Sequence, residues 1–459
     1  MIGQLLRPEI LEMIERKEWN ILKEVVLDLH PSEIADIIEN IEEKERAILF
    51  RFLPNELAAD TFEYLEHDVQ ESLLKSFTDK EIAEVLNEMS PDDRTELLEE
   101  LPGPFVKKLI RLLAPEERSV AISLLGYPED SVGRLMTPDF IAIKSHWSIG
   151  EVLEHIRKVG SQVEYIETLF VTDQQGKLLD EISIKDILLA EPSTKVTDIM
   201  KETVVSLQVT DDQEKAVELF REYDVYVLPV VNKENYLVGI VTADDVFDVI
   251  EEETTEDVQK FGGMESLDLP YISTPLPKMV QKRAGWLVIL FLSEMLTATA
   301  MGFFEHEIAR AVVLALFIPL IISSGGNSGS QAATLVIRAL ALGEITVRDW
   351  LKVVRRELLS GLSLGAILGA IGFLRISVWQ YVGNVYGEHW LPIAITVAIA
   401  LIGVVLWGTL AGSTLPLILK ALKLDPATSS APFVATLVDV TGLVIYFTVA
   451  TLILSGTLL

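Results

Sequence analysis

The sequence lacks cysteine altogether, so it contains no disulfide, no thiolate metal site and no cysteine nucleophile. It has only six histidines, no HExxH pair and no phosphate-binding glycine loop. These absences argue against an enzyme. The start of the chain, "MIGQLLRPEILEMIERKEW", also lacks the apolar core of a signal peptide. We therefore predict a non-enzymatic protein whose first part is cytoplasmic.

Net charge is missing from the last part of the 459-residue chain. Residues 284–459 contain nine acidic and nine basic residues, whereas residues 1–283 contain 60 acidic and 29 basic residues. The whole formal charge of −31 therefore belongs to the first part. So acidic a surface argues against a nucleic-acid partner and favours cations. The neutral, apolar last part predicts a domain in the lipid bilayer.

Residues 1–130 are predicted to form an acidic, all-α N-terminal domain. Pro31, Pro54, Pro91 and Pro115 each precede an apolar periodic run, as in "HPSEIADIIENI" and "SPDDRTELLEEL". Proline in the first turn marks the start of a helix. Spacings of 23, 24 and 24 residues, with Thr78 interrupting the proline series, favour a superhelical stack. An irregular helical bundle is the alternative.

Residues 131–250 change to alternating strand and helix patterns that occur twice, at about 136–197 and 198–250. The copies end in "LFVTDQQGKLLDEISIKDIL" and "LPVVNKENYLVGIVTADDVF", in which Asp186 and Asp245 correspond. The repeat resembles a tandem pair of cystathionine-β-synthase (CBS) domains, which are α/β. That resemblance implies that Thr242 and Asp245 hold the ribose and phosphate of an adenine nucleotide such as ATP. A pair of CBS domains that binds nothing is the alternative.

Residues 245–270 are predicted to contain an acidic connecting helix that leads to the membrane. We call its carboxylates the acidic stripe: Asp245, Asp248, Glu252, Glu253, Glu256 and Asp257. At helical periodicity, the first three and Glu256 lie within about 80° of one another. A solvated face is the usual meaning of such a run. Carboxylates at this density are also what Mg²⁺ or Ca²⁺ can bridge.

Residues 271–459 are predicted to form an all-α transmembrane domain. Five apolar segments can cross a bilayer: about 285–304, 309–340, 358–379, 391–419 and 432–454. With the N-terminus inside, ten Lys or Arg residues flank the cytoplasmic ends and two flank the outer ends, which places the C-terminus outside. In the second span, Pro319 and the glycines of "SSGGNSGSQ" predict a broken helix with a polar interior. Small and amide residues that hold helices together are the alternative.

One carboxylate, Asp439, lies in the middle of the fifth span. A charge at that depth costs at least ~2.5 kcal/mol, so an intramembrane carboxylate predicts a functional site. A structural hydrogen bond to another helix is the alternative. Ala435 and Gly442 leave space beside the carboxylate. Glu294 in the first span is a second such residue, which either lines an outer vestibule or pairs with Arg310.

The order of these parts resembles the MgtE family of magnesium transporters. Four stretches carry the resemblance: "YPEDSVGRLMTPDF", "TTEDVQKFGG", "GGNSGSQAATLVIRAL" and "LDPATSSAPFVATLVDVTGLVIYF". It implies a homodimer in a bacterial-type plasma membrane, with the connecting helix as a plug. It also implies that Asp439, the Ala435 backbone and Asn327 line the ion path, and that Asp92 and Asp93 belong to the regulatory site. Some members of the family carry a polar Asn just before the proline of the fifth span, whereas this chain has Ala431 there.

The residues and the resemblance together predict a Mg²⁺-selective channel or transporter. Two Asp439 carboxylates facing across a two-fold axis can hold a Mg²⁺ that keeps its waters. Intracellular Mg²⁺ that bridges the acidic stripe to Asp92 and Asp93 is predicted to close the path. One alternative is a secondary carrier for Co²⁺, Ni²⁺ or Mn²⁺, and another is a membrane-anchored nucleotide sensor. The polar residues of the second span argue against a mere anchor.

Overall fold

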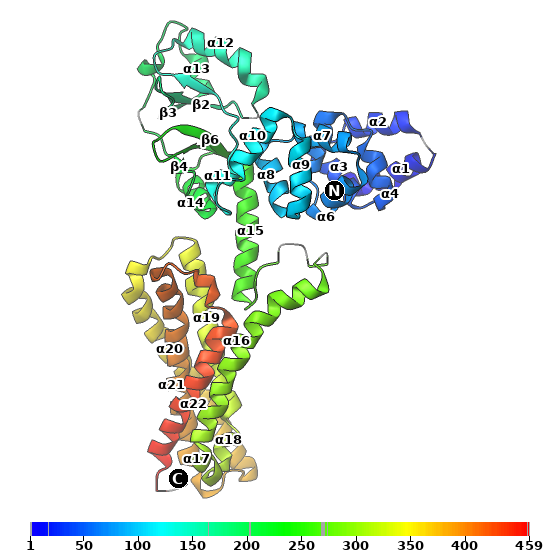
Figure 1. Cartoon of the computed structure of the whole chain (residues 1–459). Coiled ribbons are helices and arrows are strands. Elements are labelled where there is room, and N and C mark those ends of the chain that lie inside the picture. The colour runs from blue at the N-terminus through cyan, green and yellow to red at the C-terminus, as the bar shows by residue number, and fades with distance from the viewer. Residues whose placement is uncertain are drawn as a thin grey trace. The chain divides into compact units, whose positions relative to one another are not determined.

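The computed structural model describes residues 2–16, 18–163, 165–201, 203–267, 271–272, 274–456 and 458 (Figure 1). The chain divides into two compact units, Met1–Glu252 and Glu253–Leu459, which we call unit 1 and unit 2 and describe separately. Residues 268–270, at the end of the predicted connecting segment, lie outside the described residues.

The N-terminal part of unit 1 is built from short helices that stack on one another. They are α1 (Ile2–Arg16), α2 (Trp19–Leu27), α3 (Pro31–Glu39), α4 (Glu43–Phe50), α5 (Asn55–Glu63), α6 (His67–Ser76), α7 (Asp79–Glu88), α8 (Pro91–Glu100), α9 (Gly103–Leu112) and α10 (Pro115–Leu124). Three start at predicted prolines, and α5 follows Pro54. Alternate helices pack together, α1 on α3, α3 on α5, α5 on α7 and α7 on α9. This order is that of a superhelical stack rather than an irregular bundle.

Two small sheets of identical topology follow α11 (Val132–Leu135). The first copy contains β1 (Ala142–Lys144), α12 (Ile149–Val159), the 3₁₀ turn η1 (Gly160–Gln162), β2 (Thr168–Thr172), β3 (Leu178–Ser183), α13 (Ile184–Leu189) and η2 (Val196–Asp198). The second contains β4 (Leu207–Gln208), α14 (Gln213–Tyr223), β5 (Val227–Val231) and β6 (Leu237–Thr242). In each copy the central strand pairs in parallel with the first strand and antiparallel with the third. The predicted α/β tandem repeat is confirmed.

The acidic stripe lies on one helix, α15 (Ala243–Phe261). At its start, the Thr242 hydroxyl donates to Asp245 over 2.5 Å and the Thr242 backbone N–H donates to the same oxygen over 3.1 Å. A side chain that accepts from the backbone N–H of the residue before the helix stabilises the first turn. Asp245 therefore helps to start the helix that carries the stripe.

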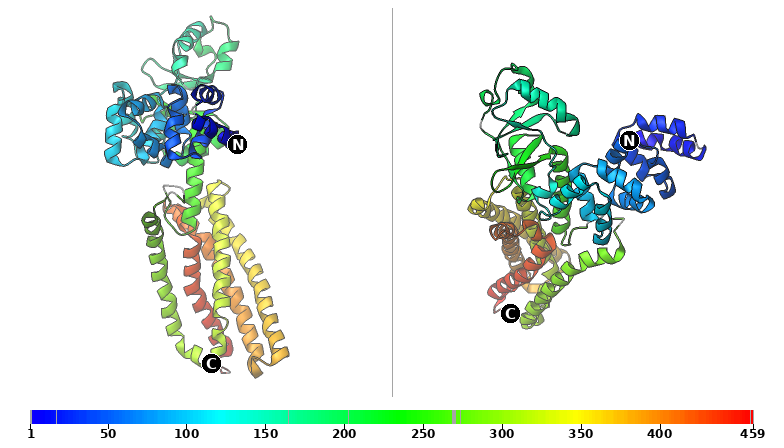
Figure 2. Two further views of the ribbon diagram at one scale, coloured as in Figure 1. Left: turned by 90° about the vertical axis from the view of Figure 1, so that its right-hand side faces the viewer. Right: turned by 45° about the horizontal axis from the view of Figure 1, so that its top comes forward.

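Unit 2 consists of long apolar helices after the end of α15. They are α16 (Leu276–Phe303), α17 (Glu305–Arg310), α18 (Val312–Ala315), α19 (Ile318–Ala341), η3 (Val347–Asp349), α20 (Trp350–Gly383), η4 (Gly387–His389), α21 (Trp390–Ala421), η5 (Pro426–Thr428) and α22 (Ala431–Leu454). Within the described ranges, five segments are long and apolar enough to cross a membrane, as predicted. Helices α19, α21 and α22 pack on one another, α16 packs on α22, and α20 packs on α21 (Figure 2).

The predicted break in the second span is in a different place. The helix is interrupted at Ala311, whose φ is −124° and ψ is 68°; the short α18 follows, and α19 begins at Ile318 with Pro319 in its first turn. The glycines at 325, 326 and 329 lie inside the unbroken α19. The prediction that they break the helix was wrong, because glycine in a membrane helix permits close approach of a neighbouring helix.

Candidate functional site

Glycines bring the central helices of unit 2 into backbone contact. A Cβ atom on Gly408 of α21 would collide with the Gly325 carbonyl oxygen of α19, and one on Gly412 would collide with the Gly329 carbonyl oxygen. On its other side, α19 turns Gly326 toward α22. Only hydrogen fits between the backbones at Gly408 and Gly412, whereas Gly326 has room for ordinary contact with α22. The glycine stretch therefore fixes how α19 and α22 meet.

One face of α22 carries the predicted pore residues beside Gly326. Ala431, Ala435 and Asp439 follow at intervals of four residues and so share a helix face. A Cβ on Gly326 would lie 3.5 Å from the Ala435 Cα and 3.7 Å from an Asp439 carboxylate oxygen. The Ser330 hydroxyl donates to the Ala431 carbonyl over 3.2 Å. Backbone and carboxylate oxygens of α22 thus lie along α19.

A row of polar side chains runs along α19 beside this face. Ser323, Asn327, Gln331 and Thr334 are exposed in the single chain, at helical spacings of three or four residues. The Asn327 amide donates to the Ser323 hydroxyl over 3.4 Å. An exposed polar row on an apolar membrane helix is suited to a water-filled path, since lipid would not solvate it. Asn327 therefore lies on an exposed face of α19, next to the face on which Gly326 and Ser330 contact α22.

Glu294, whose role the sequence left open, lies within electrostatic reach of Asp439. The Glu294 side chain is exposed on α16, and its charge repels that of the half-buried Asp439. Within the described part of the chain, no three His, Asp or Glu side chains converge to hold a metal ion. Two repelling carboxylates attract a cation without enclosing it. Such a site suits an ion that keeps its water shell.

Five carboxylates of α8 and the first two turns of α15, all in unit 1, lie within electrostatic reach of their neighbours without converging into a group that could by itself hold a metal ion. They are Asp92, Asp93, Asp244, Asp245 and Asp248. Burial, followed by the charges of Asp92 and Asp244, raises the pKa of Asp245 well above its usual range. Burial and neighbouring carboxylates likewise raise the pKa of Asp93 and of Asp248. The structure thus brings the predicted pair, Asp92 and Asp93, together with the start of the acidic stripe.

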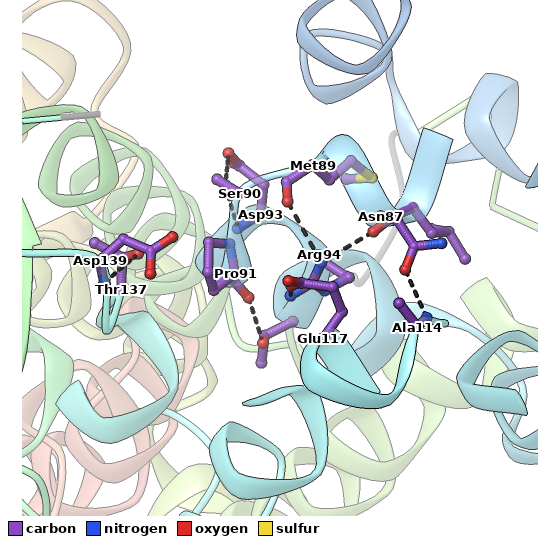
Figure 3. A network of polar contacts seen from close by, with 12 residues as sticks. Asn87, Met89, Ser90, Pro91, Asp93, Arg94, Ala114, Glu117, Thr137 and Asp139 are labelled. Carbon is purple, nitrogen blue, oxygen red and sulfur yellow. Dashed lines mark hydrogen bonds and ion pairs between the residues drawn. The ribbon is translucent and has the colours of Figure 1, made fainter. Parts of the chain in front are cut away.

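A buried arginine holds the α8 helix that carries this pair. Arg94 is fully buried, donates to the Leu86 carbonyl over 3.0 Å, and pairs with Glu117 of α10 over 2.7 Å (Figure 3). The Ser90 hydroxyl accepts from the Asp93 backbone N–H over 3.3 Å and caps the helix. These contacts fix the first turn of α8. Sequence analysis did not single out Arg94, because its partners are distant in the chain.

The remaining stripe residues have different neighbours. In unit 1, Glu252 accepts a bond from Gln213 over 3.4 Å. In unit 2, Glu256 pairs with Lys260, while burial and the charge of Asp425 raise the pKa of Asp257. Glu253 is half-buried. The stripe is therefore not a uniformly solvated face.

A cavity lies beside the second CBS-like repeat, apart from the predicted nucleotide pair. It is open to solvent, has a volume of about 330 Å³ and is lined by Glu181, Thr203, Val204, Val205, Tyr223, Val225 and Leu228. Thr242 and Asp245 do not line it, and their side chains are hydrogen-bonded to each other. No motif in the sequence marked the loop at 203–205.

Comparison with known proteins supports each part of this architecture. Residues 29–130 match the MgtE intracellular N domain, residues 132–193 and 196–252 match the CBS domain, and residues 318–449 match MgtE, described as a divalent cation transporter. The magnesium transporter MgtE of Thermus thermophilus is 36% identical over 448 residues, which is 97% of this chain and 98% of that protein. The protein of the same name from Enterococcus faecalis is 35% identical over 445 residues, or 96% of each chain.

Solved structures give the same result for the first part of the chain. A crystal structure of the cytosolic domain of the Mg²⁺ channel MgtE in complex with ATP is similar, with 33% identity and a TM-score of 0.51 over 53% of this chain and 100% of that one. The soluble part of a magnesium transporter is similar, with 30% identity and a TM-score of 0.52 over 55% and 99%. With its intracellular N domain, CBS pair and multi-pass membrane domain, the chain belongs to the MgtE family of magnesium transporters, which are not enzymes.

Proposed function

We propose that the protein is a homodimeric, Mg²⁺-selective channel or transporter of the plasma membrane that intracellular Mg²⁺ closes. The observation that carries the transport path is the Ala435–Asp439 face of α22 against Gly326 of α19. The N domain lies inside the cell, and in this proposal the C-terminus lies outside, in accord with the distribution of basic residues.

The pore assignment follows from the chemistry of Mg²⁺. This ion gives up its waters reluctantly, so a selective site can hydrogen-bond the hydration shell with carboxylate and carbonyl oxygens. One chain offers Asp439 and the Ala435 carbonyl, with Asn327 on the adjacent helix. A second copy related by a two-fold axis doubles these groups around the axis. The charge of the ion offsets the unfavourable burial of two carboxylates.

The gate assignment follows from the carboxylates in unit 1. Asp245 and Asp248 are repelled by Asp92, Asp93 and Asp244, so a cation there removes unfavourable charge contacts. Glu252, Glu253, Glu256 and Asp257 continue the acidic stripe toward the membrane part. A ligand shifts a conformational equilibrium only by its differential affinity for the two states, so several Mg²⁺ ions acting together are expected.

Ion flux into liposomes that contain the purified protein tests the path. Asp439→Ala should reduce Mg²⁺ flux to the level of empty liposomes, while the protein still elutes as an assembled dimer. Glu344→Gln, which changes an exposed loop carboxylate, is the control and should keep wild-type flux. Wild-type flux in Asp439→Ala would overturn the assignment. Faster flux of Co²⁺, Ni²⁺ or Mn²⁺ than of Mg²⁺ would instead favour the alternative carrier.

The same liposomes, loaded with increasing Mg²⁺ on the cytoplasmic side, test the gate. The variant Asp248→Asn/Glu252→Gln/Glu256→Gln should need more Mg²⁺ to close while selectivity is unchanged. A control that neutralises three exposed carboxylates elsewhere in unit 1, Glu218, Glu222 and Glu234, should close as the wild type does. If the first variant closes at the same internal Mg²⁺ concentration as the wild type, the acidic stripe is only a solvated face and not part of the gate.

A second proposal is that adenine nucleotide binds the CBS pair. The cavity beside the second repeat supports it, because Val204, Val225, Leu228 and the Tyr223 ring can pack on an adenine. A related cytosolic domain was crystallised with ATP. ATP should then raise the unfolding temperature of the full chain, since a ligand at a hundredfold excess over Kd adds about 2.7 kcal/mol. No shift at millimolar ATP would leave the CBS pair a structural connection.

A further inference from the structure

The end of α15 makes a specific turn within unit 2. Gly263 has a φ of +74°, a left-handed conformation that favours glycine. The Gly263 N–H donates to the Lys260 carbonyl over 2.9 Å, and the Met264 N–H donates to the Gln259 carbonyl over 3.3 Å. This pair of bonds is the Schellman arrangement that ends a helix. The chain therefore leaves α15 in one defined direction.

Trp286 of α16 fills the space beside this turn. A Cβ on Gly263 would lie 2.7 Å from the Trp286 Cδ1 and 3.2 Å from the Pro432 Cγ, so the turn contacts both α16 and the start of α22. The Glu265 N–H also donates to the Lys282 carbonyl of α16 over 3.1 Å. The end of α15 is thus seated between two membrane helices.

The indole of Trp286 also reaches the cap of α22. Its Nε1–H donates over 3.1 Å to the Ser430 hydroxyl, which is fully buried and accepts from the Phe433 N–H over 3.4 Å. The Trp286 ring lies 6.3 Å, between centroids, from that of Phe433. One side chain therefore contacts both the turn after α15 and the first turn of α22.

An ion pair makes a second connection between the same elements. The Lys260 ammonium lies 3.0 Å from an Asp425 carboxylate oxygen, and the other Asp425 oxygen accepts from the Ala427 N–H over 2.7 Å. Asp425 caps η5, the turn that leads into α22. Lys260 also pairs with Glu256 of the acidic stripe. The side chains of both partners in the Lys260–Asp425 pair are about one-third exposed, so solvent and salt weaken this connection.

We propose that Trp286 and Lys260 are positioning residues that join the end of α15 to the start of α22, so that α15 and the pore helix move together. Asp439 lies nine residues beyond Ser430 on one helix, a distance of about 13 Å along a rigid rod. A displacement at the Ser430 cap therefore moves Ala435 and Asp439. This inference rests on the proposed gate: it names the contacts that carry Mg²⁺ binding on α15 to the path.

Trp286→Phe is the decisive variant, because it keeps an aromatic ring but removes the indole N–H that bonds to Ser430, together with the five-membered ring that lies beside Gly263. In the liposome assay, the internal Mg²⁺ that half-closes the path should change about three- to tenfold, as expected for one lost hydrogen bond. Flux at zero internal Mg²⁺ and selectivity should stay at wild-type values. Trp350→Phe, at an exposed site on α20, is the matched control and should change nothing.

Variants of Lys260 provide an independent test of the coupling if the Trp286→Phe protein does not fold. Lys260→Gln should shift half-closure in the same direction as Trp286→Phe but by less, and Lys260→Arg should restore the wild-type value. If the wild type does not close with internal Mg²⁺, the proposed gate itself fails. If the wild type closes and both Trp286→Phe and Lys260→Gln close at its concentration, the gate stands and this coupling is overturned.

Discussion

The helical N-terminal part of unit 1 and the helix bundle of unit 2 both bury apolar side chains, but they differ in the residues at their closest helix contacts. The first buries large apolar side chains such as Ile34, Phe62 and Leu73, each at most 1% exposed. The second brings glycines together at the centre of its contacts, as between Gly325 and Gly408. In water, burial of apolar surface drives packing, whereas lipid tails are as apolar as leucine and leave close backbone approach as the main gain. The surrounding solvent therefore favours large side chains at the helix contacts of unit 1 and glycine at the closest contacts of unit 2.

Hydroxyl groups show the same contrast. In unit 1, Thr78, Ser90 and Ser148 cap helix starts by accepting backbone N–H bonds. In unit 2, many hydroxyls donate instead to the carbonyl four residues earlier on their own helix, as Ser293, Thr299, Ser324, Thr334 and Thr448 do. A hydroxyl in lipid finds no water, so its own helix supplies the partner. Serine and threonine thus often cap helices in unit 1, whereas in unit 2 many of them bond within their own helix, with Ser430 at the start of α22 as an exception.

The largest loss of stability is expected when the buried charge of Arg94 is removed from the core of unit 1. Arg94→Met leaves Glu117 without its partner and the Leu86 carbonyl without its donor, which should destabilise unit 1 by about 3–5 kcal/mol. Hydrogen exchange of the α8–α10 amides in the purified chain measures this loss. Arg51→Met removes an exposed pair with Glu81 and should cost about 0–1 kcal/mol. Equal effects of the two variants would contradict the role of Arg94.

A smaller effect tests the glycine contacts of unit 2. Gly412→Ala adds a methyl group against the Gly329 carbonyl, and overpacking of this kind costs about 1–3 kcal/mol. Thermal unfolding in detergent should show a lower midpoint for this variant. Gly302→Ala on α16, where no atom lies within 4 Å of the added group, should be neutral or slightly stabilising. A stable Gly412→Ala protein would mean that the helices separate easily.

The smallest effect concerns pH and the charged junction of unit 1. Because the pKa values of Asp93, Asp245 and Asp248 are raised, folded unit 1 binds protons more readily than the unfolded chain. Their contribution to stability is fully present below the normal Asp pKa of about 4 and is lost as the pH rises through the raised values. Without Mg²⁺, unit 1 should therefore unfold about 2–4 °C higher at pH 5.5 than at pH 7.5.

The variant Asp245→Asn separates this effect from that of other carboxylates. Glu81, whose pKa hydrogen bonds from Arg51 and Thr78 lower to about 2, acts in the opposite direction, but it is the same in both proteins. The variant should have a flatter pH dependence and gain less from added Mg²⁺ at pH 7.5. An unchanged pH dependence would mean that Asp245 is not part of the repelling cluster.

Local sequence signals predicted where helices start. They did not predict features that depend on contacts between residues far apart in the chain. Pro31, Pro91 and Pro115 start helices as predicted, because proline acts on its own backbone and needs no partner. The same local reasoning predicted that the glycines of α19 break the helix, and that prediction was wrong. Their backbone contacts to α21 come from about 80 residues away in the sequence, and spacing rules do not reach that far.

The candidate sites divide in the same way. Asp439 stood out because a carboxylate in an apolar run is anomalous whatever surrounds it, and Asp92 and Asp93 came from resemblance alone. The contacts Arg94–Glu117, Trp286–Ser430 and Lys260–Asp425 join ordinary residues, none unusual in its own stretch of chain. Only the folded arrangement makes them informative.

The glycine contacts also limit how this protein can change over generations. A core of isoleucine and leucine can lose a methylene at one site and gain one at a neighbouring site, so its composition can drift while its volume is kept. Glycine is the smallest residue, so every replacement at Gly408 or Gly412 adds atoms where the backbone of a facing glycine already lies. No single substitution in the facing helix can make room by becoming smaller. Single substitutions are therefore expected to be tolerated on the lipid-facing sides of the bundle and to be disfavoured at these central glycine contacts.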